Sequence, residues 1–183
     1  PAVPSYPFGE VPLTDYLRRW AAVQPGKPAV VFYGTSITYQ ELDRLSDAFA
    51  RLLADNGLQA GDRVAVFLPN CPQFAIAFHG LLKLGCVHVP VNPMFKEHEL
   101  FYELDDTGAV ALVAQDQLMP LVRAVLGRTP VRTVFATSLA EMLPDAPTLP
   151  VLDVIAQPRI ACPDAIDLLP ALHRAVGAAT ETA

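Results

Sequence analysis

The stretch from Val64 to Val91 determines the fold. It contains Val64-Ala-Val-Phe-Leu68, then Pro72-Gln-Phe-Ala-Ile-Ala-Phe-His-Gly-Leu-Leu-Lys-Leu84, then Val87-His-Val-Pro-Val91. The outer two runs are short, apolar and rich in β-branched residues, as expected of strands that are covered on both faces. The middle run has the length of a helix and is apolar almost all round. This order predicts two parallel strands joined by a right-handed crossover.

The same alternation continues on both sides of this stretch. A helical pattern at Glu97–Asp105 precedes a third apolar strand at Val110–Val113, and Val131–Phe135 has the composition of one more. Upstream, Pro28–Tyr33 and Thr35–Thr38 predict a β-hairpin around a single glycine. The predicted fold class is therefore α/β, with a mainly parallel sheet and helices on both of its faces.

Capping residues mark the two helices before this stretch. Thr14 is expected to be the N-cap of a short helix that ends near Ala22. Thr38 and Glu41 have the spacing of a capping box, in which each side chain binds a backbone amide at the start of a helix. That helix is expected to end at Asn56-Gly57 and to pack its apolar stripe on the sheet.

The middle helix also carries signals at both ends. Asn70 is expected to cap it, and Gly85 is placed to adopt the left-handed conformation just after it. Lys83 lies in its last turn, where the helix dipole favours a cation. Because the helix is apolar almost all round, we expect both of its faces to be covered and Phe78 to be buried.

Prolines interrupt the pattern after about Thr129. Seven of them occur from Pro130 to Pro170. We therefore expect an N-terminal α/β subdomain over residues 1–135 and an irregular, proline-rich extension over 136–183. Within the extension, Ile166–Val176 has the pattern of one further helix.

Composition excludes several classes of function. The formal charge of −6 argues against a nucleic-acid partner, because binding to phosphates needs a basic face. No run of ~18 apolar residues is present, so no transmembrane segment is predicted. The three cysteines form no Cys-x-x-Cys pair and follow no secretory signal, which favours a reducing, cytoplasmic location. A hydrophobic fraction of 52% suggests surface that more protein covers, and hence possible self-association.

Two motifs resemble those of a known family. Ser36-Ile-Thr-Tyr-Gln-Glu-Leu42 resembles the tyrosine-and-acid motif that follows the first hairpin of adenylate-forming enzymes. Gly80-Leu-Leu-Lys-Leu-Gly-Cys-Val-His-Val-Pro-Val-Asn-Pro93 resembles their Leu-Lys-x-Gly-x-x-x-x-Pro-x-Asn-Pro stretch. The resemblance extends from about Leu13 to about Ala114. The chain is thus similar to the N-terminal subdomain of AMP-forming acyl-CoA synthetases, of the kind that act on long-chain fatty acids.

This resemblance implies a parent enzyme that uses ATP, Mg²⁺ and coenzyme A to convert a small carboxylic acid to its acyl-adenylate and then to its thioester. Leu68–Phe74 and Asn92–Phe95 favour a fatty or aryl acid. The family's Ser/Thr/Gly-rich phosphate loop, its catalytic acid and its catalytic lysine all come later than Ala183. We therefore expect no catalytic, cofactor-binding or metal-binding residue in this chain, which should be inactive alone.

The resemblance also nominates two substrate-pocket residues, Phe78 and His79, since the family's acyl pocket lies beside the sheets that their helix covers. The simpler interpretation makes His79 and His88 hydrogen-bonded histidines of the core. Cys71 lies at a helix start, a position that can lower a thiol pKa, but ordinary packing explains it as well.

Two alternatives to the ligase remain. One is a non-enzymatic module for packing, dimerisation or ligand binding, and the other is an unrelated α/β ligand-binding domain of the same architecture. A dinucleotide-binding domain is disfavoured because no Gly-x-Gly-x-x-Gly occurs. A zinc-protease helix is disfavoured because Tyr102 follows His98 where a second histidine is needed.

Overall fold

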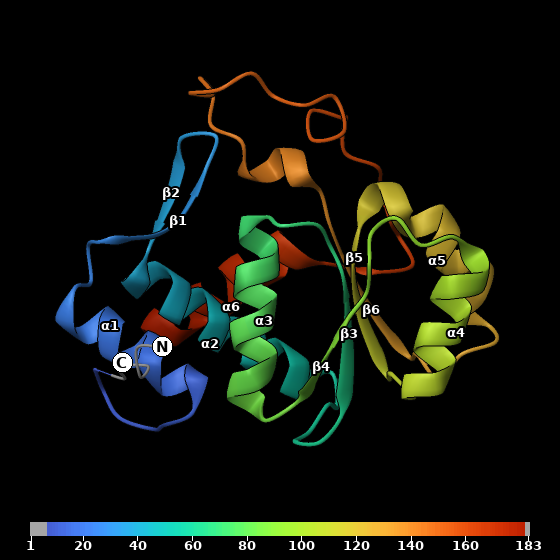
Figure 1. The fold of residues 1–183 in the computed structure, drawn as a ribbon, viewed down its shortest axis with the longest axis horizontal. Coiled ribbons are helices and arrows are strands. Elements are labelled where there is room, and N and C mark those ends of the chain that lie inside the picture. The colour runs from blue at the N-terminus through green and yellow to red at the C-terminus, as the bar shows by residue number, and fades with distance from the viewer. Residues whose placement is uncertain (1–6, 182–183) are drawn as a thin grey trace, which may run out of the picture.

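The computed structural model describes residues 7–181 of the chain (Figure 1). Its helices are α1 (Leu13–Val23), α2 (Tyr39–Asp55), α3 (Pro72–Leu84), α4 (Glu97–Thr107), α5 (Met119–Leu126) and α6 (Leu168–Glu181), with 3-10 turns η1 (Asp116–Leu118) and η2 (Leu139–Met142). Its strands are β1 (Pro28–Phe32), β2 (Thr35–Thr38), β3 (Arg63–Phe67), β4 (Val87–Pro90), β5 (Ala111–Gln115), β6 (Thr133–Thr137) and β7 (Ile166–Asp167).

The described residues form two sheets. The strands β1 and β2 pair as the predicted antiparallel hairpin. The main sheet has the order β4-β3-β5-β6-β7, and every neighbouring pair in it is parallel. The predicted parallel arrangement of the first three strands is confirmed. Its two edges are short: β4 has four residues and ends at Pro90, and β7 has two.

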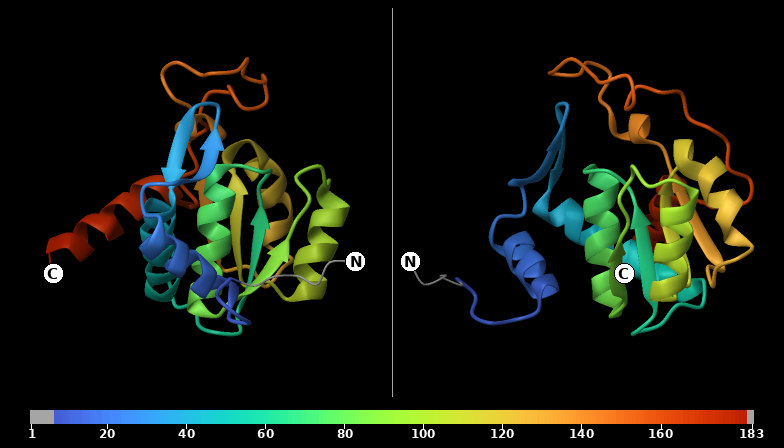
Figure 2. Two further views of the ribbon diagram at one scale, coloured as in Figure 1. Left: turned by 60° about the vertical axis from the view of Figure 1, so that its left-hand side comes forward. Right: turned by 45° about the vertical axis from the view of Figure 1, so that its right-hand side comes forward.

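Helices cover both faces of the main sheet, as predicted (Figure 2). Side chains alternate along each strand, so Val64 and Val66 of β3 join one core cluster while Ala65 and Phe67 join the other. The first cluster is completed by α1, α2, α3 and α6, and the second by α4 and α5. The molecule is therefore a three-layer α/β structure with its sheet in the middle.

The apolar stripe of α2 packs differently from the prediction. Instead of lying directly on the sheet, α2 has its most extensive contact with α3 and a second one with α6. Gly80 of α3 allows the close approach, since a Cβ there would lie 2.8 Å from Cβ of Phe49 and 2.9 Å from the carbonyl oxygen of Ser46. The Phe49 ring reaches inward and meets the ring of Phe135 on β6 at 5.4 Å between centroids.

The predicted capping box is confirmed. The Glu41 amide donates to Thr38 Oγ1 at 3.2 Å, and the Thr38 amide donates to Glu41 Oε2 at 2.8 Å. These bonds satisfy orphan amides of the first turn and hold the pKa of the Glu41 carboxyl below its ordinary value. Gly85 ends α3 in the left-handed conformation with φ of +85°, also as predicted.

Two other predicted caps are wrong. Helix α1 begins at Leu13, after Pro12, and has no side-chain cap, so Thr14 lies inside its first turn. Cys71, not Asn70, is the N-cap residue of α3, again without a side-chain bond. In both helices a proline next to the start, Pro12 or Pro72, marks the boundary instead, because it fixes φ and lacks an amide that would need a partner.

The sheet and core continue past residue 135. Strand β6 ends at Thr137, β7 pairs with it, and Leu168 and Leu172 of α6 are fully buried against the first core cluster. The prolines break up a shorter stretch than predicted, residues 143–165, which has no regular helix or strand. This segment passes the tip of the hairpin, where the Thr148 amide donates to the Tyr33 carbonyl at 2.8 Å (Figure 1).

Helix α3 is less enclosed than predicted. Its residues Ile76, Ala77 and Leu81 are fully buried, but Phe78 is only partly buried. The reason is topology: α3 lies next to β4, the edge of the sheet, so one side of the helix has no neighbouring helix to cover it. Among the described residues, no helix has the length and apolar character needed to cross a membrane.

Candidate functional site

His79 lines an apolar cavity of about 370 Å³ beneath α1. Tyr16 and Trp20 of α1 and Tyr39 of α2 form its aromatic walls. The rings of Trp20 and Tyr39 lie 6.1 Å apart, so Tyr39 joins the start of α2 to α1. The cavity has the apolar character of a site for a hydrocarbon or aryl group, with His79 as a polar group in its wall.

The prediction that His79 is a hydrogen-bonded core histidine is wrong for one ring atom. Its buried Nδ1 has no hydrogen-bond partner among the described residues. Burial lowers the pKa of His79, the positive charge of Lys83 lowers it further, and Asp43 opposes both effects. His79 therefore presents a neutral imidazole near pH 7.

Phe78 does not line the cavity under α1. Its ring stacks with that of Phe74 at 6.1 Å and meets the edges of His79 at 5.3 Å and His88 at 5.1 Å. The two predicted substrate residues are thus in contact with each other, but only His79 borders the cavity under α1. The aromatic cluster of Phe74, Phe78 and His88 lies between α3 and the edge strand β4.

His88 is the polar member of this cluster. Its Nε2 is buried and has no partner within residues 7–181, so the predicted hydrogen bond to this atom is absent there. Burial lowers the pKa of His88. Both histidines of α3 and β4 are therefore held in the neutral form by their apolar surroundings.

Lys83, in the last turn of α3, also forms ion pairs with two carboxylates. Its Nζ lies 2.6 Å from Oδ1 of Asp43 and 2.9 Å from Oδ1 of Asp47, both on α2, and donates to the Asp43 carbonyl at 2.8 Å. The side chain is 1% exposed. The ammonium therefore joins α3 to α2 and stands beside His79 without reaching solvent.

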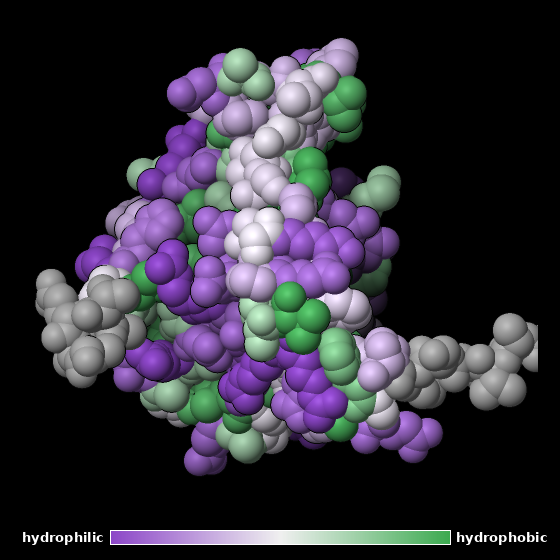
Figure 3. Space-filling view, turned by 90° about the vertical axis from the view of Figure 1, so that its left-hand side faces the viewer, coloured by the Kyte–Doolittle hydropathy of each residue, from purple (hydrophilic) through white to green (hydrophobic). Residues whose placement is uncertain are grey.

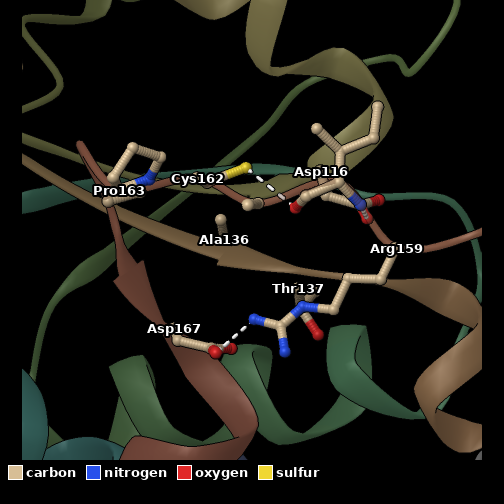
Figure 4. Close-up of a pocket in the computed structure, with 10 residues that line it drawn as sticks. Asp116, Ala136, Thr137, Arg159, Cys162, Pro163 and Asp167 are labelled. Carbon is tan, nitrogen blue, oxygen red and sulfur yellow. Dashed lines mark hydrogen bonds and ion pairs between the residues drawn. The ribbon is translucent and has the colours of Figure 1, made fainter.

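A second cavity, of about 500 Å³, lies at the carboxyl ends of β5, β6 and β7 (Figure 4). Asp116 follows β5, Thr137 ends β6 and Asp167 ends β7, and all three line it. Arg159 and Cys162 of the 143–165 segment form the opposite side. Arg159 forms ion pairs with Asp167 and, at 3.2 Å, with Glu141.

Sequence reasoning missed this second cavity. A signal existed for Asp116, since polar residues directly after a buried strand lie at the carboxyl edge of a parallel sheet. None existed for Arg159, which stands in a proline-rich stretch without periodicity, or for Asp167, which belongs to a two-residue strand.

The cysteines are free thiols. Burial raises the pKa of Cys71 to about 11, which is opposite to the lowering that its place at a helix start could have produced. Burial also raises the pKa of Cys86 to about 11. Cys162, in the wall of the second cavity, is partly exposed and has a pKa above its ordinary value.

The expectation that this chain holds no Mg·ATP stays a prediction. No group of three or more His, Cys, Asp or Glu in the described part of the chain has an arrangement that could hold a metal ion. Lys27, which follows Gly26, places its ammonium 5.9 Å from the centre of the Trp20 ring instead of in a glycine-rich loop.

His98 and Tyr102 line a shallow apolar surface pocket on α4.

Comparison with known proteins shows which sequences this chain resembles. A family model described as AMP-binding enzyme matches residues 17–168. A long-chain-fatty-acid–CoA ligase of Bacillus subtilis is 39% identical over 140 residues, which cover 75% of this chain and 25% of the ligase. A ligase of the same name from Escherichia coli O6:H1 is 34% identical over 167 residues, covering 88% of this chain and 30% of the ligase. The chain thus spans less than a third of the length of these relatives.

Solved structures agree with this assignment. A fatty acyl CoA synthetase of Mycobacterium tuberculosis is 31% identical with a TM-score of 0.64, covering 74% of this chain and 28% of its own. A benzoate CoA ligase of Burkholderia xenovorans, at 21% identity, shares the fold with a TM-score of 0.69 over 89% of this chain and 28% of its own. Since the family model covers well over half of the sequence, the chain belongs to the family of AMP-binding enzymes.

Proposed function

We propose that this chain is part of an AMP-forming ligase that joins a long-chain fatty acid to coenzyme A. The identity of 39% over 140 residues to a long-chain-fatty-acid–CoA ligase carries the proposal. A fatty acid is favoured over an aryl acid, since the benzoate ligase resembles the chain only in fold, at 21% identity.

In the proposed reaction the carboxylate attacks the α-phosphorus of ATP, giving an acyl-adenylate and releasing pyrophosphate. The thiol of coenzyme A then attacks the acyl carbon and releases AMP. Mg²⁺ would neutralise the phosphate charges when it is bound. We place no step of this reaction on residues 7–181. Apart from a proposed contact with the acid, their part is structural: the main sheet and its helices support segments that bind ATP and coenzyme A.

His79 remains our proposed contact for the acid, and Phe78, whose ring touches His79, remains a proposed residue of the same pocket. The support is the apolar cavity under α1, whose aromatic walls suit a hydrocarbon tail and whose neutral imidazole adds no charge to desolvate. The free thiols support the proposal that the enzyme works in the cytoplasm, where cysteines stay reduced.

The test compares the 183-residue chain with the complete product of its gene. Both are assayed for carboxylate-dependent pyrophosphate exchange and for acyl-CoA formation, with palmitate, octanoate and benzoate as acids. We expect the complete product to be active with palmitate most of all, and the 183-residue chain to show no exchange above background. Activity of the short chain, or a complete product that activates none of these acids, would show that the proposal is wrong.

A further inference from the structure

The cavity of about 500 Å³ at the carboxyl ends of β5, β6 and β7 has the place and size of a ligand site. In open α/β sheets, ligands bind outside the carboxyl ends of the parallel strands. The volume is within the range of sites for small molecules. No contact that we assign to the ligase reaction involves this cavity.

Buried polar side chains gather around this edge of the sheet. Apart from Ser46 on α2, the buried polar residues among those described stand at the carboxyl ends of β5 and β6 or at the start of α3, which faces them: Gln73, Gln115, Asp116, Thr137 and Ser138. Burying polar groups costs free energy unless they are hydrogen-bonded. This concentration therefore calls for a reason other than core packing.

Two buried acceptor atoms of this region have no hydrogen-bond partner among the described residues. Gln73 Nε2 donates to the Ser138 carbonyl at 2.7 Å, but the buried Oε1 of Gln73 has no partner among the described residues. Asp167 accepts from Arg159 through Oδ2, while its Oδ1 likewise has no partner there. Both unpartnered atoms are acceptors. Gln73 does not line the cavity, but Asp167 does, and its free acceptor would bind a group that brings N–H or O–H donors.

The net charge of the cavity lining also favours a ligand that donates hydrogen bonds. Arg159 is already paired with Asp167 and with Glu141 behind it. Among the residues that line the cavity, the carboxylates of Asp116 and Asp167 outnumber the one guanidinium, which leaves one net negative charge. Anions such as carboxylates and phosphates are therefore repelled, and an organic cation is favoured.

The shape of the site is held in place by its own bonds. The Ile160 amide donates to Asp116 Oδ2 at 2.8 Å, which fastens the 143–165 segment to the end of β5. Further along, Arg123 of α5 binds Asp164 through two bonds of 2.7 Å. The wall is thus preorganised, and a ligand would not have to order it on binding.

We propose that this cavity binds a small organic cation with a flat apolar body, of the amidine or aromatic amine class. The cationic head donates to Asp167 Oδ1 and to Asp116. The body packs on Ala136, Ile160 and Ala165, which supply the apolar part of the lining. Because the acid, ATP and coenzyme A of the proposed ligase are all anions, the site serves a different molecule from those the enzyme converts.

Cys162 provides a direct readout, because it lines the cavity while Cys71 and Cys86 are buried. The 183-residue protein is treated with iodoacetamide in increasing benzamidine, and alkylation of each cysteine is followed by mass spectrometry. Benzoate, which has the same ring and the opposite charge, is the matched control ligand. We expect benzamidine to slow alkylation of Cys162 in a saturable manner, and benzoate to leave the rate unchanged. Equal effects of the two ligands, or none from benzamidine, overturn the proposal.

Two variants locate the binding. Asp167→Asn removes the charge at the unpartnered oxygen and should weaken benzamidine binding by ~10-fold or more. Ala161→Trp, on an exposed part of the wall, fills the cavity with little risk to folding and should abolish protection. Asp153→Asn, which alters an exposed carboxylate of the same segment outside the lining, is the control and should bind as the unsubstituted protein does. If Asp167→Asn and Ala161→Trp both bind normally, the cavity is not the site.

Discussion

The ammonium of Lys83 lies 2.6 Å from the carboxylate of Asp43, and this contact joins the two helices that share the most extensive interface of the domain. The lysine side chain is 1% exposed, whereas that of Asp43 is 23% exposed. The cost of desolvating the cation is thus offset by a carboxylate that still reaches water.

Removal of the Asp43 carboxylate should destabilise the protein. Asp43→Ala leaves the buried ammonium of Lys83 with Asp47 and one carbonyl, so we expect a loss of about 2–3 kcal/mol, at or below the low end for a broken buried pair. Chemical denaturation by urea measures it. Arg18→Ala, which removes an exposed partner of Asp47 at 3.7 Å, is the control and should cost less than about 1 kcal/mol. Equal losses in the two variants would mean that burial of Lys83 is energetically unimportant.

The two phenylalanines Phe49 and Phe78 should differ in their effect on stability. Phe49 of α2 is 0% exposed and packs against the Phe135 ring, so Phe49→Ala should cost about 3–5 kcal/mol. Phe78 is partly buried at the edge of the sheet, and Phe78→Ala should cost about half as much. The measurement compares the urea midpoints of the two variants, with the slopes of the free energy of unfolding against urea concentration unchanged. A larger loss for Phe78 would contradict the assigned burial.

Stability should fall below neutral pH partly because of His79 and His88. Their pKa values are lowered in the folded protein, so the unfolded chain takes up protons first as the pH falls through the ordinary pKa of about 6.5. The free energy of unfolding therefore decreases from pH 7 towards pH 5. In a His79→Phe, His88→Phe double variant, the decrease should be smaller than in the unsubstituted protein. His98→Phe, at an exposed position on α4, is the control and should leave the slope unchanged.

Self-association remains a prediction, now with a defined surface. Leu149, Leu152 and Val154 of the 143–165 segment are 63%, 61% and 54% exposed. By contrast, the face over α1 and the hairpin carries scattered apolar side chains among hydrophilic ones (Figure 3). We expect the sedimentation coefficient to rise with protein concentration, and to rise less when the three residues are changed to serine. Met94→Ser, at an exposed position outside the 143–165 segment, should have no effect. A monomer at every concentration contradicts the prediction.

The sequence predicted the parts of the fold that repeat a local pattern. Strands β3 and β5 and helix α3 appear as apolar runs of the right length, so their order was sufficient to place them. The pattern was insufficient for β7, whose two residues have no periodicity, and for the packing of α6, which depends on the distant helix α2. Likewise the second cavity depends on contacts such as that of Ile160 with Asp116, 44 residues apart, which no local pattern encodes.

The two short edges of the main sheet determine how this domain can meet other chains. An exposed edge strand offers unpaired amides and carbonyls on which a further strand can add. Here β4 offers only four residues and ends at Pro90, which has no amide to donate, and β7 offers only two. Growth of the sheet by added strands is therefore suppressed at both ends, which protects the protein from fibrous aggregation.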